Sequence, residues 1–322
     1  TPRQTRGCTR GTKAQRRRRR DQPCAVTASG GLLSLAPVIL VILAAFIHAT
    51  WNLLVKQAAA GGPTFVFAYN LVACIAYAPW VAWLLAQGAL TWSLPIAGCI
   101  LLGGLIHLAY SLCLQRGYQV ADLSVVYPVA RGTGPTMSSL GAFLLLGEMP
   151  SAQGLLGLAA VVIGIGLIST QGDLAAFRRP GGQAGLRWGA ATGLLIAAYT
   201  VVDAYGVKTL GIQPVVLDWC SNLLRFVLLA PVVLRDPDRA RELIRGRWLL
   251  AVGVGLLSSL SYILVLAALN MGAPLSVVAP TREMSMMIGA LFGMVILREA
   301  VGAWRLVGCL VLIAGVVLLG TT

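Results

Sequence analysis

Long apolar runs separated by short polar connections dominate the chain from about residue 32 onward. A helix needs about 20 mostly apolar residues to cross the hydrocarbon core of a bilayer. Because lipid offers the backbone no hydrogen-bond partners, each crossing segment is expected to be a helix, and the runs lack the period-two alternation of membrane barrels. The pattern therefore predicts an all-α integral membrane protein with ten transmembrane helices, at about 36–56, 64–86, 95–116, 123–146, 151–170, 188–208, 214–234, 248–268, 275–297 and 302–320.

Composition and charge agree with a membrane protein. Apolar residues make up 57% of the 322 residues and charged residues 11%, whereas a soluble domain carries about 25% charged residues. The net charge of +14 lies largely in a basic tail at residues 1–31 and otherwise mainly in loops, where Lys and Arg set topology or contact anionic lipid. We therefore expect a disordered tail, membrane lipid as a partner, and no nucleic acid.

The two halves of the chain repeat one another. Polar and small residues of the first half recur 152 positions later, and the offset becomes 151 after one residue is lost. We call two residues matched in this way repeat mates. The predicted organisation is the tail, a first five-helix repeat at 32–170, a linker at 171–187 and a second five-helix repeat at 188–322. The repeat mates include Lys56 and Lys208, Asn70 and Asn222, Tyr110 and Tyr262, Pro128 and Pro280, Arg131 and Arg282, Glu148 and Glu299, Gly157 and Gly308, and Gly164 and Gly315.

An odd number of crossings in each repeat predicts that the repeats are inverted. A unit that crosses the membrane five times ends on the side opposite its start, so its tandem copy begins on the other face. Inverted repeats are a recurring plan of secondary transporters, in which the two halves exchange conformations and thereby open the site to the other side. The orientation of the termini stays open, because the tail and the arginines at 171–187 and 235–247 favour opposite orientations.

A shared set of motifs marks the end of each half. A proline lies early in the fourth run, a Gly-Glu or Arg-Glu pair ends it, and a run with spaced glycines follows. In these motifs, and over about residues 32–320, the chain resembles the drug/metabolite transporter superfamily, specifically its ten-helix EamA-type members. The segment from His48 to Asn52 is similar to one branch of that family, whereas Arg298 stands where the family usually has glycine. The resemblance implies export or exchange of metabolites such as amino acids, nucleosides or other small organic solutes.

Polar side chains within the apolar runs are candidates for a solute site, because polar groups at membrane depth usually face a cavity or a partner. His48, Trp51 and Asn52 share one helical face by their i, i+3, i+4 spacing. Hydrogen bonding between helices is the alternative role, and the sequence does not separate the two roles for any one residue. The predicted substrate-binding residues are His48, Trp51, Asn52, Asn70, His107, Tyr110, Arg131, Asn222, Tyr262 and Arg282.

Charged residues and prolines within the runs suggest further roles. The fork of Arg131 suits a carboxylate or phosphate, with a structural ion pair to Glu283 or Asp203 as the alternative. Coupling requires a group that changes charge, and Asp203 and Glu283 are the predicted coupling residues; Asp218 and Arg225 are weaker candidates. The predicted structural residues are Pro128 and Pro280, which open their helices locally, and Glu148 and Glu299, which cap short interfacial turns.

Other functions would leave other motifs. An integral-membrane transferase would show a nucleophile cluster, a metal-ligand set or an acidic phosphate motif, and the sequence has no HExxH, Asp-rich or Walker A motif. The seven cysteines have no CxxC spacing, so neither a metal nor a disulfide is expected. A lipid flippase or an accessory membrane protein stays an alternative. We expect a non-enzymatic transporter in the cell membrane, without a cofactor, that takes a small-molecule metabolite and a coupling proton or counter-solute; substrate, direction and oligomeric state stay open.

Overall fold

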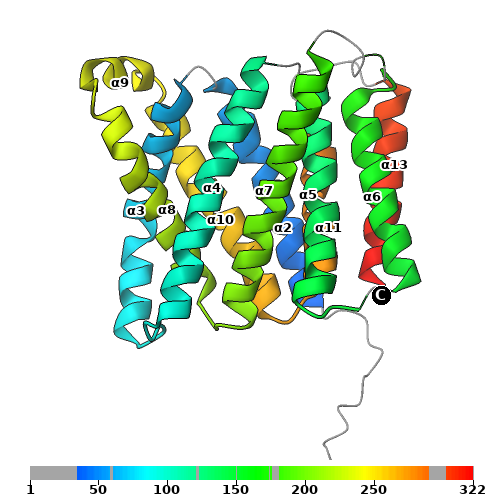
Figure 1. Cartoon of the computed structure of the whole chain (residues 1–322), viewed down its shortest axis with the longest axis horizontal. Coiled ribbons are helices and arrows are strands. Elements are labelled where there is room, and N and C mark those ends of the chain that lie inside the picture. The colour runs from blue at the N-terminus through cyan, green and yellow to red at the C-terminus, as the bar shows by residue number, and fades with distance from the viewer. Residues whose placement is uncertain are drawn as a thin grey trace, which may run out of the picture. The chain divides into compact units, whose positions relative to one another are not determined.

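The computed structural model describes residues 35–58, 61–120, 123–149, 151–173, 175, 181–289 and 302–321. Within these ranges all regular structure is helical (Figure 1). After the last residue of α11, helical backbone resumes over 284–289. The helices are α2 (Leu35–Gln57), α3 (Gly62–Ala86), α4 (Leu94–Val120), α5 (Leu123–Leu145), α6 (Ala152–Thr170), α7 (Gly182–Lys208), α8 (Pro214–Val233), α9 (Pro237–Ile244), α10 (Trp248–Asn270), α11 (Leu275–Arg282) and α13 (Ala303–Gly320).

Helix length and hydropathy identify a multi-pass membrane protein. Among the described residues, eight helices are long and apolar enough to cross a membrane, namely α2, α3, α4, α6, α7, α8, α10 and α13. The prediction of an all-helical membrane fold is therefore confirmed. α5 is as long as these helices, but Arg131 and several Gly, Thr and Ser residues make it more polar. Part of the span expected at 275–297 lies outside the described residues, so a total of ten crossings stays a prediction.

The span expected as one helix over 275–297 is interrupted at Glu283, just after α11. Pro280 lies inside α11 and has no N–H to donate to the carbonyl four residues earlier, that of Ser276. The hydroxyl of Ser139 on α5 donates to this freed carbonyl, with Oγ 3.5 Å from the oxygen. The proline thus weakens the helix and opens one backbone acceptor to a neighbouring helix.

Two connections also differ from the expectation. The segment 235–247, expected as a loop, contains α9, because the Asp236 side chain accepts a hydrogen bond from the backbone N–H of Arg239 and Pro237 occupies the first turn. α7 begins at Gly182, inside the linker expected at 171–187.

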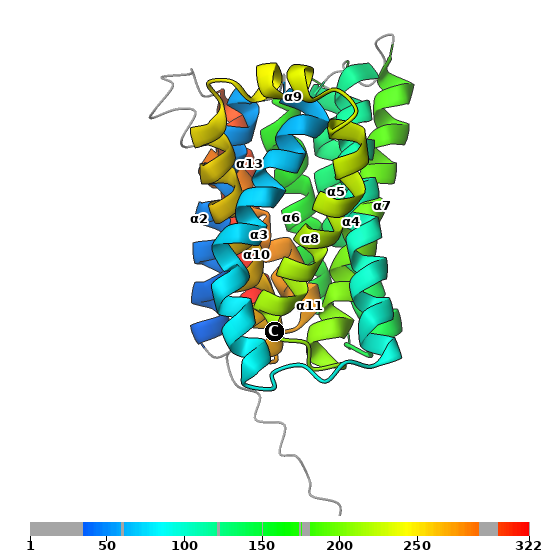
Figure 2. The ribbon, with the colours of Figure 1, turned by 90° about the vertical axis from the view of Figure 1, so that its left-hand side faces the viewer.

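The two ends of the bundle differ in the elements that cover them. α9 lies at one end, and the C-terminal end of α13 lies at the other, together with the connection from α5 to α6 (Figure 1). We call these the α9 end and the Glu148 end. Turned by 90°, the bundle shows α9 lying across the ends of α3, α8 and α10 (Figure 2). From α2 to α10 the long helices therefore run alternately toward and away from the α9 end.

Corresponding helices of the two repeats pack antiparallel. On α6 and α13, a Cβ added to Gly157 would lie 2.9 Å from the carbonyl oxygen of Gly315, and one added to Gly164 would lie 2.8 Å from that of Gly308. Gly157 is the repeat mate of Gly308, and Gly164 is that of Gly315. The two contacts are therefore exchanged by a pseudo-two-fold relation between the halves, and glycine is required because any side chain would push the backbones apart.

A second pair of corresponding helices obeys the same relation. Phe67 on α3 stacks on Phe226 of α8 at 4.7 Å between ring centroids. The indole of Trp219, the repeat mate of Phe67, donates to the carbonyl of Cys74, the repeat mate of Phe226, at 2.8 Å. The chain thus folds as two copies of one helical unit joined about a pseudo-two-fold axis.

Candidate functional site

A cavity of about 950 Å³ lies between the two repeats. At the α9 end its wall includes Ala58, Gly62, Gln171 and Arg305, which lie at the ends of their helices. Such a volume is typical of sites for small organic molecules. Nine of the ten predicted substrate-binding residues line the cavity, namely His48, Trp51, Asn52, His107, Tyr110, Arg131, Asn222, Tyr262 and Arg282.

Asn70 is the predicted binding residue that the described cavity wall does not include. Its side chain is fully buried, and neither its amide nitrogen nor its amide oxygen has a hydrogen-bond partner. Its repeat mate Asn222 lines the cavity. The two asparagines therefore occupy matched sequence positions but different surroundings.

The Glu148 end of the bundle is filled by a cluster of buried apolar residues that includes Ala44, Ala204, Val207, Leu217, Leu266 and Ala279. Adding or subtracting 152 gives their repeat mates, which are Ile196, Asn52, Val55, Phe65, Leu114 and Tyr127. All six repeat mates line the cavity. Apart from Ala44, which itself borders the cavity, these positions of the repeat unit therefore lie away from the cavity at one end and line it at the other, and we call the set without Ala44 the sealing cluster.

Arg131 is the centre of a network that joins the two repeats. Its Nη1 lies 3.2 Å from Oε2 and 3.4 Å from Oε1 of Glu283, and its Nη2 lies 3.1 Å from Nε2 of His48. Because a guanidinium only donates, Nε2 of His48 must accept this bond. The ring of Tyr127 lies 5.3 Å from the guanidinium carbon, and Nε of Arg282 lies 3.7 Å from Oε1 of Glu283. The ion pair to Glu283 that the sequence offered as an alternative is thus present beside the cavity.

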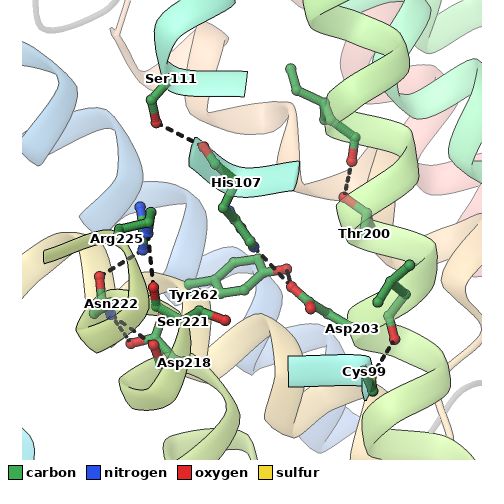
Figure 3. A network of polar contacts seen from close by, with 12 residues as sticks. Cys99, His107, Ser111, Thr200, Asp203, Asp218, Ser221, Asn222, Arg225 and Tyr262 are labelled. Atoms are coloured by element: carbon green, nitrogen blue, oxygen red, sulfur yellow. Dashed lines mark hydrogen bonds and ion pairs between the residues drawn. The ribbon is translucent and has the colours of Figure 1, made fainter. Parts of the chain in front are cut away.

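Asp203 belongs to a second network, shown in Figure 3. Its Oδ2 lies 2.9 Å from Nε2 of His107 and accepts a hydrogen bond of 2.5 Å from the hydroxyl of Tyr262. The ring of His107 also stacks on that of Tyr199 at 3.8 Å between centroids. His107 and Tyr262 line the cavity, whereas Asp203 is 1% exposed and its Oδ1 has no hydrogen-bond partner. The carboxylate therefore lies behind the cavity wall and contacts it through two wall residues.

A third network follows one face of α8 (Figure 3). The amide nitrogen of Asn222 donates to Oδ2 of Asp218 at 2.8 Å and to the hydroxyl of Ser259 at 3.1 Å. The guanidinium of Arg225 donates to the amide oxygen of Asn222 at 2.6 Å. All four side chains line the cavity. This network, which we call the Asn222 network, adds the carboxylate of Asp218 and the guanidinium of Arg225 to the cavity wall, separate from the charged groups around Arg131.

The carboxylate of Glu148 binds residues of the second repeat at the Glu148 end. It accepts hydrogen bonds from the backbone N–H of Leu275 at 2.6 Å, and from the backbone N–H and the hydroxyl of Ser276 at 2.9 and 2.6 Å. The ammonium of Lys208 lies 3.1 Å away. Burial raises the pKa of Glu148, but these hydrogen bonds and the lysine outweigh it, so the pKa lies below its ordinary value.

Local backbone geometry explains why glycine precedes this glutamate. Gly147 has φ +70°, a conformation that other residues rarely adopt, and it turns the chain at the end of α5. The backbone N–H of Glu148 then returns to the carbonyl of Ala142 at 3.1 Å. Among the other predicted structural residues, Pro280 lies buried in α11, whereas Glu299 and the side chain of Pro128 lie outside the described residues.

Some wall residues escaped the sequence analysis. Tyr199, Ser259 and Ser261 line the cavity, and the hydroxyl of Ser261 accepts a hydrogen bond of 3.2 Å from the indole of Trp51. The sequence does hold a signal for the two serines, because Ser258, Ser259 and Ser261 form a polar cluster within an otherwise apolar run. Across the described residues, no three His, Cys, Asp or Glu side chains come together as a metal-ligand set.

Comparisons with known proteins identify the family. The sequence model of the EamA-like transporter family matches residues 35–170 and 183–321, once for each repeat. No curated protein matches the chain. A crystal structure described only as that of a protein has a TM-score of 0.69 and 16% sequence identity, with 88% of this chain and 95% of that chain covered, and this likeness shows the fold alone. Because the two family matches span nearly all of the folded unit, the chain is a multi-pass membrane protein that belongs to the EamA-like transporter family of the drug/metabolite transporter superfamily.

Proposed function

We infer that the protein is a secondary active transporter, an exporter or exchanger of a small polar metabolite. The observation that carries this proposal is the cavity between the repeats, which reaches the α9 end and is closed by the sealing cluster at the Glu148 end. A membrane enzyme needs a site for chemistry, whereas a carrier needs a chamber that opens to one side at a time. The charged side chains of the wall, among them Arg131 and Asp218, favour a solute that makes hydrogen bonds over a lipid tail.

The repeat mates support alternating access as the mechanism. Val207 and Leu217 lie in the sealing cluster away from the cavity, whereas their repeat mates Val55 and Phe65 line it. If the two halves exchanged conformations, the residues at the α9 end would pack together and the sealing cluster would separate. Ten crossings arranged as two inverted repeats, with antiparallel contacts such as that of Gly164 and Gly308, suit this exchange.

Substrate recognition is assigned to the polar side chains of the wall. In this proposal the guanidinium of Arg131 and the imidazole of His48 bind an acidic or polar end of the solute, and the Asn222 network binds its other end. Trp51, Tyr110 and Tyr262 provide the aromatic faces and hydroxyls between these ends.

Coupling to a proton is assigned to Asp203, with Glu283 as the second candidate. Asp203 is buried behind His107 and Tyr262, so a proton from the cavity would reach it through these two side chains. Glu283 is paired with Arg131 and lies near Arg282. If Asp203→Asn and Glu283→Gln both kept solute transport driven by a pH gradient at the wild-type rate, coupling through these carboxyls would be excluded.

A thermal-shift screen of metabolites on the purified protein tests the proposed function. A ligand at about 100 times its Kd adds roughly 2.7 kcal/mol to stability. Substrates are expected to stabilise the wild type but not the His48→Ala or Arg131→Ala variants. A ligand that stabilised all three proteins equally would place the site elsewhere, and stabilisation by lipids alone would favour a flippase.

A further inference from the structure

Glu148 links the two repeats at the closed end of the cavity. It stands on the connection between α5 and α6 in the first repeat, while its partners Leu275, Ser276 and Lys208 belong to the second. The partners lie on two different elements, because Leu275 and Ser276 begin α11 and Lys208 ends α7. Lys208 also donates to the carbonyl of Ala273 at 3.0 Å, which ties the end of α7 to the approach to α11.

These contacts lie beside the sealing cluster. Ala204 and Val207 of that cluster precede Lys208 on α7, and Leu275 and Ala279 of the same buried cluster lie on α11. The Ser139 hydroxyl joins α5 to α11 at the carbonyl of Ser276, the residue whose N–H and hydroxyl also bind the Glu148 carboxylate. If α5 and α11 separate when the cavity opens at this end, the carboxylate loses its three hydrogen bonds to Leu275 and Ser276.

We propose that Glu148 is a positioning residue of the transport cycle that holds the cavity closed at the Glu148 end through α11 and Lys208. This inference rests on the proposed function. Hydrogen bonds to an ionised carboxylate at a helix N-terminus are among the stronger polar contacts of a protein. The carboxylate therefore favours the state in which this end is sealed, and its removal shifts the population toward the state in which this end is open.

A cysteine placed in the sealing cluster reports that opening. Ala204 is fully buried, and its repeat mate Asn52 lines the cavity, so position 204 becomes accessible when the Glu148 end opens. Ala251 is equally buried, but its repeat mate Cys99 is buried as well. A cysteine at 251 therefore stays hidden in both states and becomes accessible only if the protein unfolds.

The experiment measures the rate at which a maleimide alkylates Ala204→Cys or Ala251→Cys in the reconstituted full-length chain, with the seven native cysteines replaced by serine. Glu148→Gln, which keeps the shape of the side chain, is expected to raise the rate at position 204 by about tenfold or more, since hydrogen bonds to a charge are lost. Lys208→Met is expected to raise it less, because only one contact of Glu148 disappears. The matched control is Asp238→Asn, which neutralises an exposed ion pair with Arg241 on α9 and is expected to change neither rate.

Each outcome decides the proposal. A faster reaction at 204 with an unchanged reaction at 251 supports it. Equal acceleration at both positions means that Glu148 only stabilises the fold, and unchanged rates in both the Glu148→Gln and Lys208→Met variants mean that it does not hold the closed state; either result overturns the proposal. The measurement needs no solute, so a failed ligand screen would count against the proposed function and leave this test standing.

Discussion

Arg131 and Glu283 form a buried ion pair that joins the two repeats, with Nη1 of the arginine 3.2 Å from Oε2 of the glutamate. Arg131 is 8% exposed and faces the cavity, whereas Glu283 is fully buried behind it. Glu283 lies at the interruption after α11, where the turn places its carboxylate between Arg131 and Arg282. The pair therefore connects the cavity wall, through Arg131 of α5, to the turn that follows α11.

Removing one partner of this pair is expected to destabilise the protein. Arg131→Met leaves the buried Glu283 carboxylate with the 3.7 Å contact to Nε of Arg282 in place of its closer partner, and breaking a buried ion pair typically costs about 3–5 kcal/mol. Replacing both partners, as in the double variant Arg131→Met and Glu283→Gln, is expected to cost less than the single Arg131→Met change. Thermal unfolding of the detergent-purified variants measures the difference. A double variant less stable than either single variant would show that the two side chains do not compensate one another.

Close packing of α6 on α13 is expected to depend on the glycines. Gly164→Ala places a methyl group about 2.8 Å from the carbonyl oxygen of Gly308 and is expected to cost about 1–3 kcal/mol through overpacking. Gly166→Ala on the same helix is the control, because nothing lies within 4 Å of its added Cβ. Thermal unfolding compares the two variants. Equal stabilities would mean that the helices separate without cost and that the contact does not hold the repeats together.

The hydroxyl of Tyr262 is expected to stabilise the buried carboxylate of Asp203. Tyr262→Phe removes the hydrogen bond to Oδ2 and leaves His107 as the remaining polar contact of that oxygen in Figure 3. The expected loss of stability is about 1–3 kcal/mol. Tyr205→Phe, at a residue 44% exposed on the same helix as Asp203, serves as the control. A Tyr262→Phe variant as stable as the control would show that Asp203 does not need the hydroxyl.

The contacts of Glu148 are expected to lose their stabilising effect in acid. Its pKa lies below the ordinary value of 4.5, so the unfolded chain binds the proton more readily than the folded one. The stability that these contacts contribute is therefore fully present above about pH 4.5 and is lost as the pH falls through the folded pKa. The difference in melting temperature between the wild type and Glu148→Gln measures it. A difference that grew as the pH fell would contradict the assignment.

The membrane fold follows from the sequence because length and hydropathy decide whether a run can cross a bilayer. The repeat register also predicts contacts, since Gly157, Gly164 and their repeat mates meet where two antiparallel helices cross. Pro280 was expected to open its helix locally, but the place of the interruption, at Glu283, and the helix α9 were not predicted. The helix α9 begins with a hydrogen bond to the Asp236 side chain, and the interruption follows Pro280, whose freed Ser276 carbonyl accepts from Ser139 of α5. Hydropathy records neither feature.

The candidate site was predictable in composition and less so in geometry. Choosing polar residues at membrane depth found part of the wall, since nine of the ten chosen residues line the cavity. Asn70 shows the limit, because a matched sequence position does not give a matched environment once the repeats differ in conformation. The sequence did not reveal that Asp203 would sit behind His107 and Tyr262, because that arrangement joins α4, α7 and α10 across the bundle.

Solute counterflow tests the central claim most directly. Proteoliposomes that contain the full-length protein are loaded with an excess of an unlabelled ligand from the thermal-shift screen and diluted into a trace of the same ligand carrying a radiolabel. A carrier with alternating access is expected to accumulate the label transiently, while the Arg131→Ala variant and empty liposomes do not. A ligand that binds the wild type but is never exchanged across the membrane, or that crosses equally with Arg131→Ala, would contradict transport through this cavity.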